Sequence, residues 1–278
     1  MKLIGVDKII QELKLVADIN PVFPHTLIYG PYGSGKTTIA EELATITKQK
    51  IVVLNAPVID FKNIYTVLLQ LEPKSILFID EIHRLSPKVE EVLYQPMISN
   101  KLSFNFQGQL QTVDYIPFTL VGATTKPGGL SKPLLSRFRL HISVPRYTEQ
   151  DLADIIRLNY PGVSNEDALR IAQFVSVPRN AINLAFRLLQ LGKPISEALD
   201  FLGFAEKMSK EEQTFLETVG MGKISEQTLC RLLQLDIAGL EILEDRLILL
   251  GFVIITGRGR EITPPGLMAL RRIHDKKV

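Results

Sequence analysis

The sequence predicts an α/β protein, in which a parallel sheet flanked by helices is followed by a helical domain and then by a winged helix. Two observations carry this prediction. Short apolar segments without polar alternation, which are typical of strands buried on both faces, are separated by helical patterns. After the fifth segment the strands stop, and helical patterns continue until a final short hairpin. The apolar segments are residues 26–30, 51–54, 75–79, 118–122 and 140–144.

Helices are predicted on both sides of the first strand. Ile9, Leu13 and Val16 recur at helical spacing, so residues 3–19 are expected to form an amphipathic helix. Residues 36–46 form the helix that follows the first strand and its glycine-rich turn. Strands and helices therefore alternate along this part of the chain, as they do in doubly wound folds.

The stretch after the last strand of the sheet predicts a small helical domain. Residues 148–151 (Thr-Glu-Gln-Asp) and 164–167 (Ser-Asn-Glu-Asp) have the pattern of capping boxes, in which side chains satisfy free N–H groups where a helix begins. A third helix follows Pro178 and runs to Gly192. Ser196 is expected to cap a fourth helix.

The rest of the chain predicts a winged helix, which consists of three helices and a terminal β-hairpin. The expected helices are residues 211–219, 225–234 and 239–250, and the expected strands are residues 252–256 and 261–263. Residues 257–260 (Gly-Arg-Gly-Arg) form the turn between the strands. The predicted domains are therefore residues 1–146, 147–205 and 206–278.

The composition favours a soluble cytoplasmic protein with more than one domain. The chain has 278 residues, of which 22% are charged, and its formal net charge of +2 excludes a globally basic DNA-coating protein. Cys230 is the single cysteine, which excludes an internal disulfide and a cysteine-based metal site. The N-terminus lacks the pattern of a signal peptide, and the longest apolar run, residues 247–255, is too short to cross a bilayer. No membrane partner is expected.

A phosphate-binding loop is predicted at residues 30–37, whose sequence Gly-Pro-Tyr-Gly-Ser-Gly-Lys-Thr fits the pattern G-x4-G-K-[ST]. The glycines let successive backbone N–H groups turn toward a phosphate at the start of the next helix. Lys36 can reach the β- and γ-phosphates of a nucleotide, and the Thr37 hydroxyl can ligate Mg²⁺. The alternative is a glycine-rich turn with an unrelated lysine, but the strand before it and the helix after it favour the phosphate site.

Two carboxylates follow the third apolar segment. Asp80 can hold the Mg²⁺ shell, and Glu81 can polarise a water for attack on the γ-phosphate. Carboxylates also favour helix N-termini, but the phosphate loop upstream makes the catalytic interpretation the stronger one. His83 either contacts this site or has a structural role.

Hydroxyl and arginine side chains complete the candidate site. Thr124 and Thr125 follow the fourth apolar segment, at the edge of a parallel sheet where ligands bind, although a threonine pair also forms turns. Arg137 and Arg139 follow a polar loop, where one of them can act as an arginine finger on a neighbouring subunit's nucleotide. The alternative for both is a solvated charge. Arg179 is a similar candidate for the phosphates of its own subunit.

Long stretches of the sequence, spread from residue 3 to about residue 265, match the motifs of one family. They are residues 77–86 with 89–94 (Walker B), 118–125 (sensor 1), 133–134 with 137–138 (arginine finger), 178–183 (sensor 2), and 251–252 with 258–260 (wing). By these motifs the chain resembles RuvB, the motor of bacterial Holliday junction branch migration, which is a member of the AAA+ superfamily.

The resemblance implies a P-loop AAA+ large ATPase domain, a helical lid domain and a winged-helix DNA-binding domain, in that order. It implies ATP as the nucleotide and Mg²⁺ on Thr37 and Asp80, with Arg137 reaching into the neighbouring subunit's site. Lys36, Asp80 and Glu81 complete the set of candidate catalytic residues. The candidate nucleotide-binding residues are Ile4, Gly33, Gly35, Lys36, Thr37, Thr38, Thr124, Tyr147 and Arg179.

The resemblance also implies a hexameric ring around duplex DNA or the arms of a Holliday junction. Members of this family couple to the junction-binding protein RuvA through a protruding β-hairpin, and the candidate here is residues 102–113 with Gly108 at the turn. The alternative is a hairpin that covers the sheet. The sequence departs from the family pattern at Tyr32, residues 98–100, Leu135, Ser136, Arg139 and Ile255.

A local excess of positive charge near the C-terminus is the candidate DNA contact. Arginine and lysine outnumber the acids in residues 254–278. Arg258 and Arg260, on a glycine-containing wing, can enter a minor groove in a contact that is sensitive to salt and indifferent to sequence. A solvated basic tail is the alternative, and it accounts for Lys276 and Lys277.

Taken together, these features predict an ATP-dependent DNA motor that drives branch migration in recombination and DNA repair. The main alternative is a nucleotide-switched DNA-binding regulator or loader subunit with slow ATP turnover. A subunit that binds ATP without hydrolysing it is a third interpretation, which Lys36, Asp80 and Glu81 disfavour. The sequence leaves open the host, the existence of a RuvA partner, and whether Arg137 or Arg139 is the finger.

Overall fold

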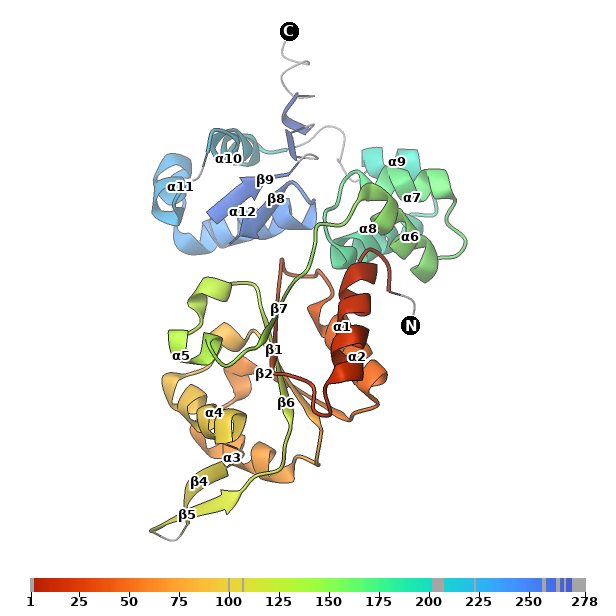
Figure 1. The fold of residues 1–278 in the computed structure, drawn as a ribbon. Coiled ribbons are helices and arrows are strands. Elements are labelled where there is room, and N and C mark those ends of the chain that lie inside the picture. The colour runs from red at the N-terminus through yellow and green to blue at the C-terminus, as the bar shows by residue number, and fades with distance from the viewer. Residues whose placement is uncertain are drawn as a thin grey trace. The chain divides into compact units, whose positions relative to one another are not determined.

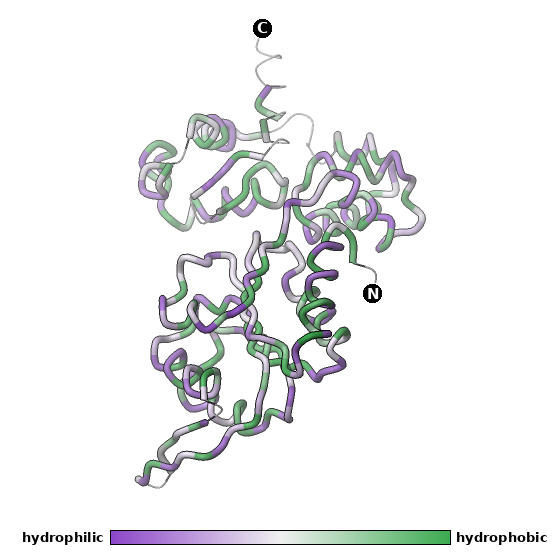
Figure 2. The backbone as a smooth tube through the Cα atoms, viewed as in Figure 1, coloured by the Kyte–Doolittle hydropathy of each residue, from purple (hydrophilic) through white to green (hydrophobic). Residues whose placement is uncertain are grey.

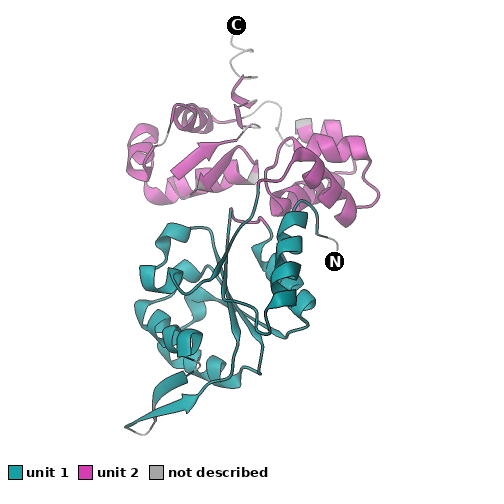
Figure 3. Cartoon of the chain, viewed as in Figure 1, with its two compact units in different colours: residues 1–30, 35–145 teal, residues 31–34, 146–278 magenta. Residues whose placement is uncertain are grey.

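The computed structural model describes residues 3–99, 101–106, 108–201, 208–222, 224–256, 259–263, 266–267 and 269–271. The chain forms two compact units, which Figure 3 shows in different colours. The first unit consists of residues 1–30 and 35–145, and the second consists of residues 31–34 and 146–278. Four residues of the phosphate-binding loop therefore group with the second unit.

A five-stranded sheet in which all neighbouring strands are parallel forms the centre of the first unit, with the order β2-β3-β6-β1-β7. Each strand lies within two residues of a predicted segment, and Figure 2 shows the hydrophobic residues concentrated along these strands. The prediction of a parallel sheet is confirmed. The strands are β1 (Thr26–Tyr29), β2 (Ile51–Asn55), β3 (Ile76–Asp80), β6 (Thr119–Thr124) and β7 (Leu140–Ser143).

Helices cover both faces of this sheet (Figure 1). One face carries α1 (Asp7–Ile19) and α2 (Lys36–Thr47), and the other carries α3 (Phe61–Gln70), α4 (Pro87–Ser99) and α5 (Lys132–Leu135). Short 3-10 turns are present at η1 (Ala56–Val58), η2 (Ile82–Arg84) and η3 (Pro127–Gly129). The predicted first helix begins at Asp7 rather than at residue 3, because Gly5 has a positive φ of 77° that a helix does not allow.

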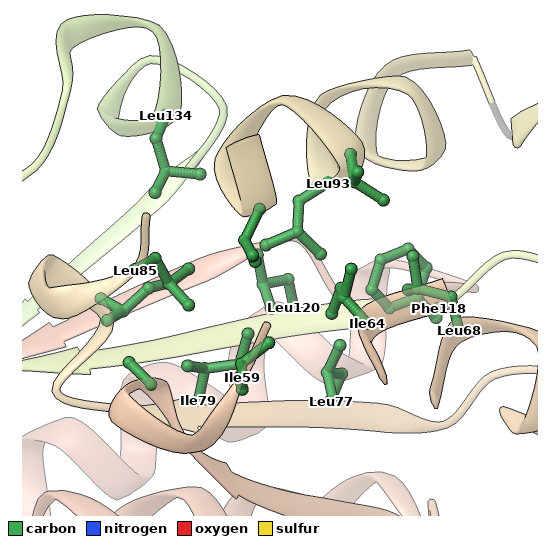
Figure 4. Packing of buried hydrophobic residues seen from close by; sticks show 14 of the residues in the cluster. Ile59, Ile64, Leu68, Leu77, Ile79, Leu85, Leu93, Phe118, Leu120 and Leu134 are labelled. Carbon is green, nitrogen blue, oxygen red and sulfur yellow. The ribbon is translucent and has the colours of Figure 1, made fainter. Parts of the chain in front are cut away.

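The alternation of side chains along the strands divides the core between the two faces. Leu77 and Ile79 of β3 and Leu120 of β6 point toward the same face and are completely buried. Figure 4 shows them packed beneath residues of the helices on that face. The helix residues labelled there are Ile64 and Leu68 from α3, Leu93 from α4 and Leu134 from α5.

A β-hairpin formed by β4 (Lys101–Phe106) and β5 (Gln109–Asp114) is separate from the main sheet and projects away from it (Figure 1). Gly108 lies in the turn with a φ of 81°, as predicted. Leu102 at the base of the hairpin belongs to the buried core, whereas Leu110 near the turn is 78% exposed. The hairpin is thus anchored at its base and does not cover the sheet along its length.

The second unit begins with four helices around their own hydrophobic core. Thr148 and Asp151 form the predicted capping box at the start of α6, and the Ser164 hydroxyl accepts a hydrogen bond from the Asp167 N–H at the start of α7. The prediction that Ser196 caps the fourth helix is wrong, because that helix already begins at Ile195, directly after Pro194. The helices are α6 (Glu149–Asn159), α7 (Asn165–Ala172), α8 (Pro178–Gln190) and α9 (Ile195–Phe201).

Three further helices and a two-stranded sheet follow, and they pack around a second core within the same unit. They are α10 (Lys210–Gly220), α11 (Glu226–Leu233), α12 (Ile237–Leu249), β8 (Val253–Thr256) and β9 (Gly259–Ile262). The last strand begins two residues earlier than predicted, and residues 257–258 of the predicted turn lie outside the described residues. The division of this unit into lid and winged-helix domains stays a prediction.

In the described part of the chain, no helix combines the length and the apolar character that crossing a membrane requires.

His25 joins the start of β1 to two other elements of the first unit. Its Nδ1 accepts a hydrogen bond of 2.9 Å from the Leu120 N–H, and its Nε2 lies 3.3 Å from the Met97 carbonyl oxygen. The ring is neutral in this arrangement, with the proton on Nε2. Burial lowers the pKa of His25 from 6.5 to about 4, and the positive charge of Arg139 acts in the same direction.

We therefore expect the stability of the protein to fall as the pH is lowered from about 6.5 to about 4. In this window the unfolded chain binds a proton at His25 and the folded chain does not. The slope contributed by this residue is at most about 1.4 kcal/mol per pH unit. Urea unfolding followed by circular dichroism at a series of pH values measures the free energy of unfolding. This free energy should fall less steeply with decreasing pH in His25→Asn than in the parental protein. Equal slopes in the two proteins would exclude His25 as the cause.

Candidate nucleotide-binding site

The phosphate-binding loop begins where β1 ends and finishes where α2 begins. The Gly30 N–H donates to the Thr124 carbonyl oxygen at 3.3 Å, which joins the loop to β6. Gly35 has a φ of 89° and precedes the first residue of α2, Lys36. The Lys36 side chain is only 6% exposed, and its Nζ donates to the Gly30 carbonyl oxygen at 3.0 Å. The loop thus holds a buried ammonium group beside the N-terminus of a helix, as a phosphate site requires.

The middle of the loop, residues 31–34, belongs to the second unit and contacts other residues of that unit. The Arg179 N–H donates to the Gly33 carbonyl oxygen at 3.3 Å, and the Tyr147 hydroxyl donates to the Ser34 carbonyl oxygen at 2.9 Å. The Arg179 guanidinium carbon lies 4.5 Å from the centre of the Tyr32 ring. Two residues predicted to bind nucleotide, Tyr147 and Arg179, therefore contact the loop directly.

Gly33 and Tyr147 each meet a local physical requirement of this arrangement. Gly33 has a φ of 75°, and a Cβ added there would lie 2.9 Å from the Arg179 Cβ, so a larger residue would displace one of them. Burial raises the pKa of Tyr147 to about 12, and the Asp151 carboxylate adds to the effect. The Tyr147 hydroxyl therefore stays protonated and remains a hydrogen-bond donor to the loop.

The predicted catalytic carboxylates lie at the carboxyl end of β3. The Asp80 Oδ1 accepts a hydrogen bond of 2.9 Å from the Glu81 N–H. Glu81 has a φ of 50°, the left-handed conformation that non-glycine residues adopt infrequently, and it starts the 3-10 turn η2. The chain therefore turns directly after the strand, at the second of the two carboxylates.

Glu81 belongs to a small polar cluster with residues of β6 and η2. The Thr125 hydroxyl donates to the Glu81 Oε2 at 3.1 Å, and the His83 Nδ1 lies 3.2 Å from the same oxygen. The His83 Nδ1 also lies 2.9 Å from the Thr124 hydroxyl oxygen, which accepts a further hydrogen bond from the Lys126 N–H. His83 is therefore part of the site, and it connects the predicted catalytic glutamate with the predicted sensor threonine.

The electrostatic surroundings of His83 favour its neutral form. Burial lowers its pKa below the usual 6.5, and the Glu81 carboxylate opposes this shift. The positive charges of Lys126, Arg84 and Lys36 lower the pKa further. The imidazole is therefore neutral near pH 7. Depending on its tautomer, Nδ1 can donate a hydrogen bond to Glu81 or Thr124, or accept one from the Thr124 hydroxyl.

Gly122 brings the turn that carries these residues close to β6, a role that was not predicted. A Cβ added at Gly122 would lie 2.8 Å from the Ile82 Cδ1 and 3.1 Å from the Phe138 Cζ. Ile82 lies between Glu81 and His83 and is completely buried. A glycine inside an apolar strand was the only signal of this close approach in the sequence.

The side chains present fit a magnesium ion bound together with a nucleotide. Thr37 at the start of α2 and Asp80 at the end of β3 supply hydroxyl and carboxylate oxygens, which are the ligands that Mg²⁺ prefers. Among the described residues, no group of three or more His, Cys, Asp or Glu side chains could hold a metal ion. Few protein ligands are expected for Mg²⁺ in such a site, because phosphate oxygens and waters complete its shell. Ile4, one of the predicted nucleotide contacts, is half-buried ahead of α1.

Arg137 lies two residues after α5, beside the Tyr94 ring. Its guanidinium carbon is 4.6 Å from the centre of the ring, and its Nη1 donates to the Pro133 carbonyl oxygen at 2.6 Å and to the Ser136 hydroxyl at 3.0 Å. Its Nε is buried and has no hydrogen-bond partner among the described residues. Arg139, the other candidate finger, is exposed.

The two predicted DNA-binding residues differ in what the structure reveals about them. Arg258 lies outside the described residues. The Arg260 side chain is only 13% exposed, and it forms ion pairs with the buried Glu244 and, at 3.1 Å, with Glu226. Its role in DNA binding stays a prediction, whereas its contacts place it at the junction of α11, α12 and β9.

Comparison with known proteins agrees with this architecture. Residues 2–144 match the family described as the Holliday junction DNA helicase RuvB P-loop domain. The Holliday junction branch migration complex subunit RuvB of Nitratiruptor sp. is 36% identical over 230 residues, which cover 78% of this chain and 67% of that protein. The protein of the same name from Fusobacterium nucleatum is 30% identical, with 97% of this chain and 89% of that protein covered.

Solved structures show the same similarity. The Thermotoga maritima RuvB Holliday junction branch migration motor has a TM-score of 0.73 and 32% identity, and the match covers 96% of this chain and 95% of that one. A mutant of the same Thermotoga maritima protein has a TM-score of 0.75 and 31% identity, with 97% of this chain and 96% of that chain covered. The likeness therefore extends over both compact units and not over the P-loop region alone.

The contacts of Arg260 generate a prediction about stability. Arg260→Met removes the partner of a carboxylate, Glu244, that is only 4% exposed, so we expect a loss of about 3–5 kcal/mol in the free energy of unfolding. Urea unfolding followed by circular dichroism measures it. The double variant Arg260→Met/Glu244→Met should recover much of this loss, because it leaves no unpaired buried charge.

Arg146 provides the matched control. Its ion pair with Glu261 spans 3.6 Å, and its side chain is 78% exposed. The change Arg146→Met should alter the stability by less than about 1 kcal/mol. If Arg260→Met were equally harmless, Arg260 would be a surface charge rather than a structural one.

Proposed function

The chain belongs to the RuvB family, and from this premise we propose that it is the ATP-driven motor subunit of Holliday junction branch migration. The observation that carries the proposal is the site at the carboxyl edge of the sheet, where the phosphate loop contacts Thr124 at the end of β6 and Glu81 contacts the next residue, Thr125. A P-loop ATPase domain binds nucleotide, and ATP hydrolysis is the energy source of motors of this family. The chain spans 67% of the first relative described above and 89% of the second, so the activity of the whole complex is part of the proposal.

We further propose a role for each residue that contacts the nucleotide. Backbone N–H groups from Gly33 to Thr38 receive the phosphates, and the Lys36 ammonium exchanges its bond with the Gly30 carbonyl for the β- and γ-phosphates. Arg179 and Tyr147 act through the same loop, which they already contact. Ile4, ahead of α1, is a further nucleotide contact.

The residues of the polar cluster act on the γ-phosphate. Glu81 positions and polarises the attacking water, and Thr124 senses whether the γ-phosphate is present. Magnesium held by Thr37 and Asp80 would supply charge neutralisation on the phosphate oxygens. His83 lies between Glu81 and Thr124, so the state of the sensor can reach the catalytic carboxylate through one side chain.

A complete catalytic site needs two copies of the chain. Arg137 acts as the arginine finger on the nucleotide of a neighbouring subunit in a hexameric ring, where its charge stabilises the transferring phosphoryl group. The position of Arg137 beside a ring and two neutral oxygens supports this role, since none of these partners neutralises its charge.

The remaining parts of the chain serve DNA and a partner protein. Residues 1–146 form the AAA+ large ATPase domain, residues 147–205 a helical lid, and residues 206–278 a winged helix whose Arg258 and Arg260 contact duplex DNA. The hairpin β4–β5 binds a RuvA-like junction-binding protein, and its projecting, exposed tip supports this assignment. The names of the relatives favour this motor over a nucleotide-switched regulator or loader.

ATP turnover with and without duplex DNA tests the proposal. We expect DNA to stimulate steady-state hydrolysis, and we expect Arg137→Ala to lower the stimulated rate by about 10³-fold or more, because the finger stabilises the transition state. Arg139→Ala is the matched control and should keep most of the rate. Slow turnover that responds neither to DNA nor to Arg137→Ala would instead favour the regulator or loader.

The role of Glu81 is tested by Glu81→Gln, which keeps the size and polarity of the side chain and removes its charge. The variant should bind ATP with parental affinity and hydrolyse it about 10²–10⁴-fold more slowly, because the water loses its general base. Equilibrium binding of a fluorescent ATP analogue and single-turnover hydrolysis measure the two quantities. Near-parental turnover would exclude Glu81 from the mechanism.

A further inference from the structure

We propose that Tyr94 is a positioning residue for the arginine finger: its ring holds the Arg137 guanidinium in place and leaves the charge of that group available to the neighbouring subunit's nucleotide. The inference rests on the proposed function, because it requires Arg137 to act in trans. Tyr94 itself has no contact with a nucleotide in this scheme.

The Tyr94 ring is fixed by hydrogen bonds at its hydroxyl. This hydroxyl donates to the Glu90 Oε2 at 3.1 Å and lies 3.1 Å from the Ser131 hydroxyl oxygen. Glu90 stands one turn earlier on α4 and is only 7% exposed, and it also accepts a hydrogen bond from Ser131. Three side chains therefore close a compact polar triangle, and the ring has little freedom to rotate away from it.

The same triangle connects α4 to α5, the helix that delivers Arg137. The Ser131 hydroxyl accepts a hydrogen bond from the Leu134 N–H and caps the N-terminus of α5. Arg137 follows two residues after the end of that helix and returns to the Tyr94 ring. The backbone of Arg137 is thus positioned by α5, and its guanidinium is positioned by the Tyr94 ring on α4.

The contacts of the Arg137 guanidinium hold the group in place without neutralising its positive charge. Within the described part of the chain, Arg137 forms no ion pair, and Nη1 makes both of its hydrogen bonds. An aromatic face attracts a cation without cancelling its charge, as a carboxylate would. The carboxylate of the triangle, that of Glu90, instead accepts hydrogen bonds from two hydroxyl groups.

Such an arrangement affects the rate more than the binding of ATP. A side chain that is already ordered loses less entropy when it meets the phosphoryl group, and a misplacement of about 1 Å can cost about 10²-fold in rate. The nucleotide contacts of a subunit's own loop do not involve Tyr94. Loss of the ring is therefore expected to lower kcat while the dissociation constant for ATP stays close to the parental value.

The experiment compares the DNA-stimulated ATPase of the full chain with that of three tyrosine variants. We expect Tyr94→Leu to lower kcat by at least about 10-fold, and Tyr94→Phe, which keeps the aromatic face but loses the hydroxyl that fixes it, to lower kcat by a smaller factor. Tyr65→Leu is the control, because Tyr65 is also half-buried in the first unit but packs on Phe61 instead. Thermal unfolding verifies that each variant folds, and Tyr94→Met replaces Tyr94→Leu if the latter does not.

A double-mutant cycle separates positioning from a general structural effect. In the Arg137→Ala background, Tyr94→Leu should cause no further loss of kcat, because the group on which it acts is gone. A further loss as large as that in the parental background would overturn the inference. If kcat fell in Arg137→Ala but not in Tyr94→Leu, the positioning role of Tyr94 would be wrong and the proposed arginine finger would stand. If Arg137→Ala kept the parental kcat, both the positioning role and the arginine finger would be wrong.

Discussion

The parallel pairing of β3, β6 and β1 is the constraint on which the rest of the candidate site depends. Parallel strands end at a common edge, so the residues that follow them meet there although they are distant in the sequence. β6 lies between the other two strands, and its Thr124 is paired with Tyr29 at the end of β1. The phosphate loop, the carboxylates and the sensor threonine are therefore brought to one edge by backbone pairing, before any of their side chains interact.

Close packing against β6 then sets the position of the turn that follows β3. Gly122 leaves room for the buried Ile82 against β6, and this contact holds the turn on which Glu81 and His83 lie. Glu81, directly before the buried Ile82, has a left-handed backbone, a conformation that non-glycine residues adopt infrequently. A hydrophobic contact thus fixes the geometry of a polar site, and it does so from the core side of the sheet.

Three arginines of the chain differ in whether their neighbours neutralise the positive charge. Arg137 and Arg179 each lie over a tyrosine ring, at 4.6 and 4.5 Å from the ring centre, where the charge is attracted but not cancelled. Arg260 is enclosed by the carboxylates of Glu244 and Glu226, which satisfy it electrostatically. The first two keep a charge that no carboxylate pairs with among the described residues, whereas the third is already paired and holds three elements of the second unit together.

The sequence by itself determined the five strands, the phosphate loop, the pair Asp80 and Glu81 and the capping box that starts α6, because each is a local pattern of neighbouring residues. It also determined the family, through long motifs. It did not identify the role of His83, the close approach at Gly122 or the polar triangle around Tyr94. Each of these depends on contacts between residues about 40 positions apart, such as Tyr94 with Ser131, and no local pattern encodes which side chains will meet across such a distance. Only the tertiary structure decided them, because packing and strand order set those distances.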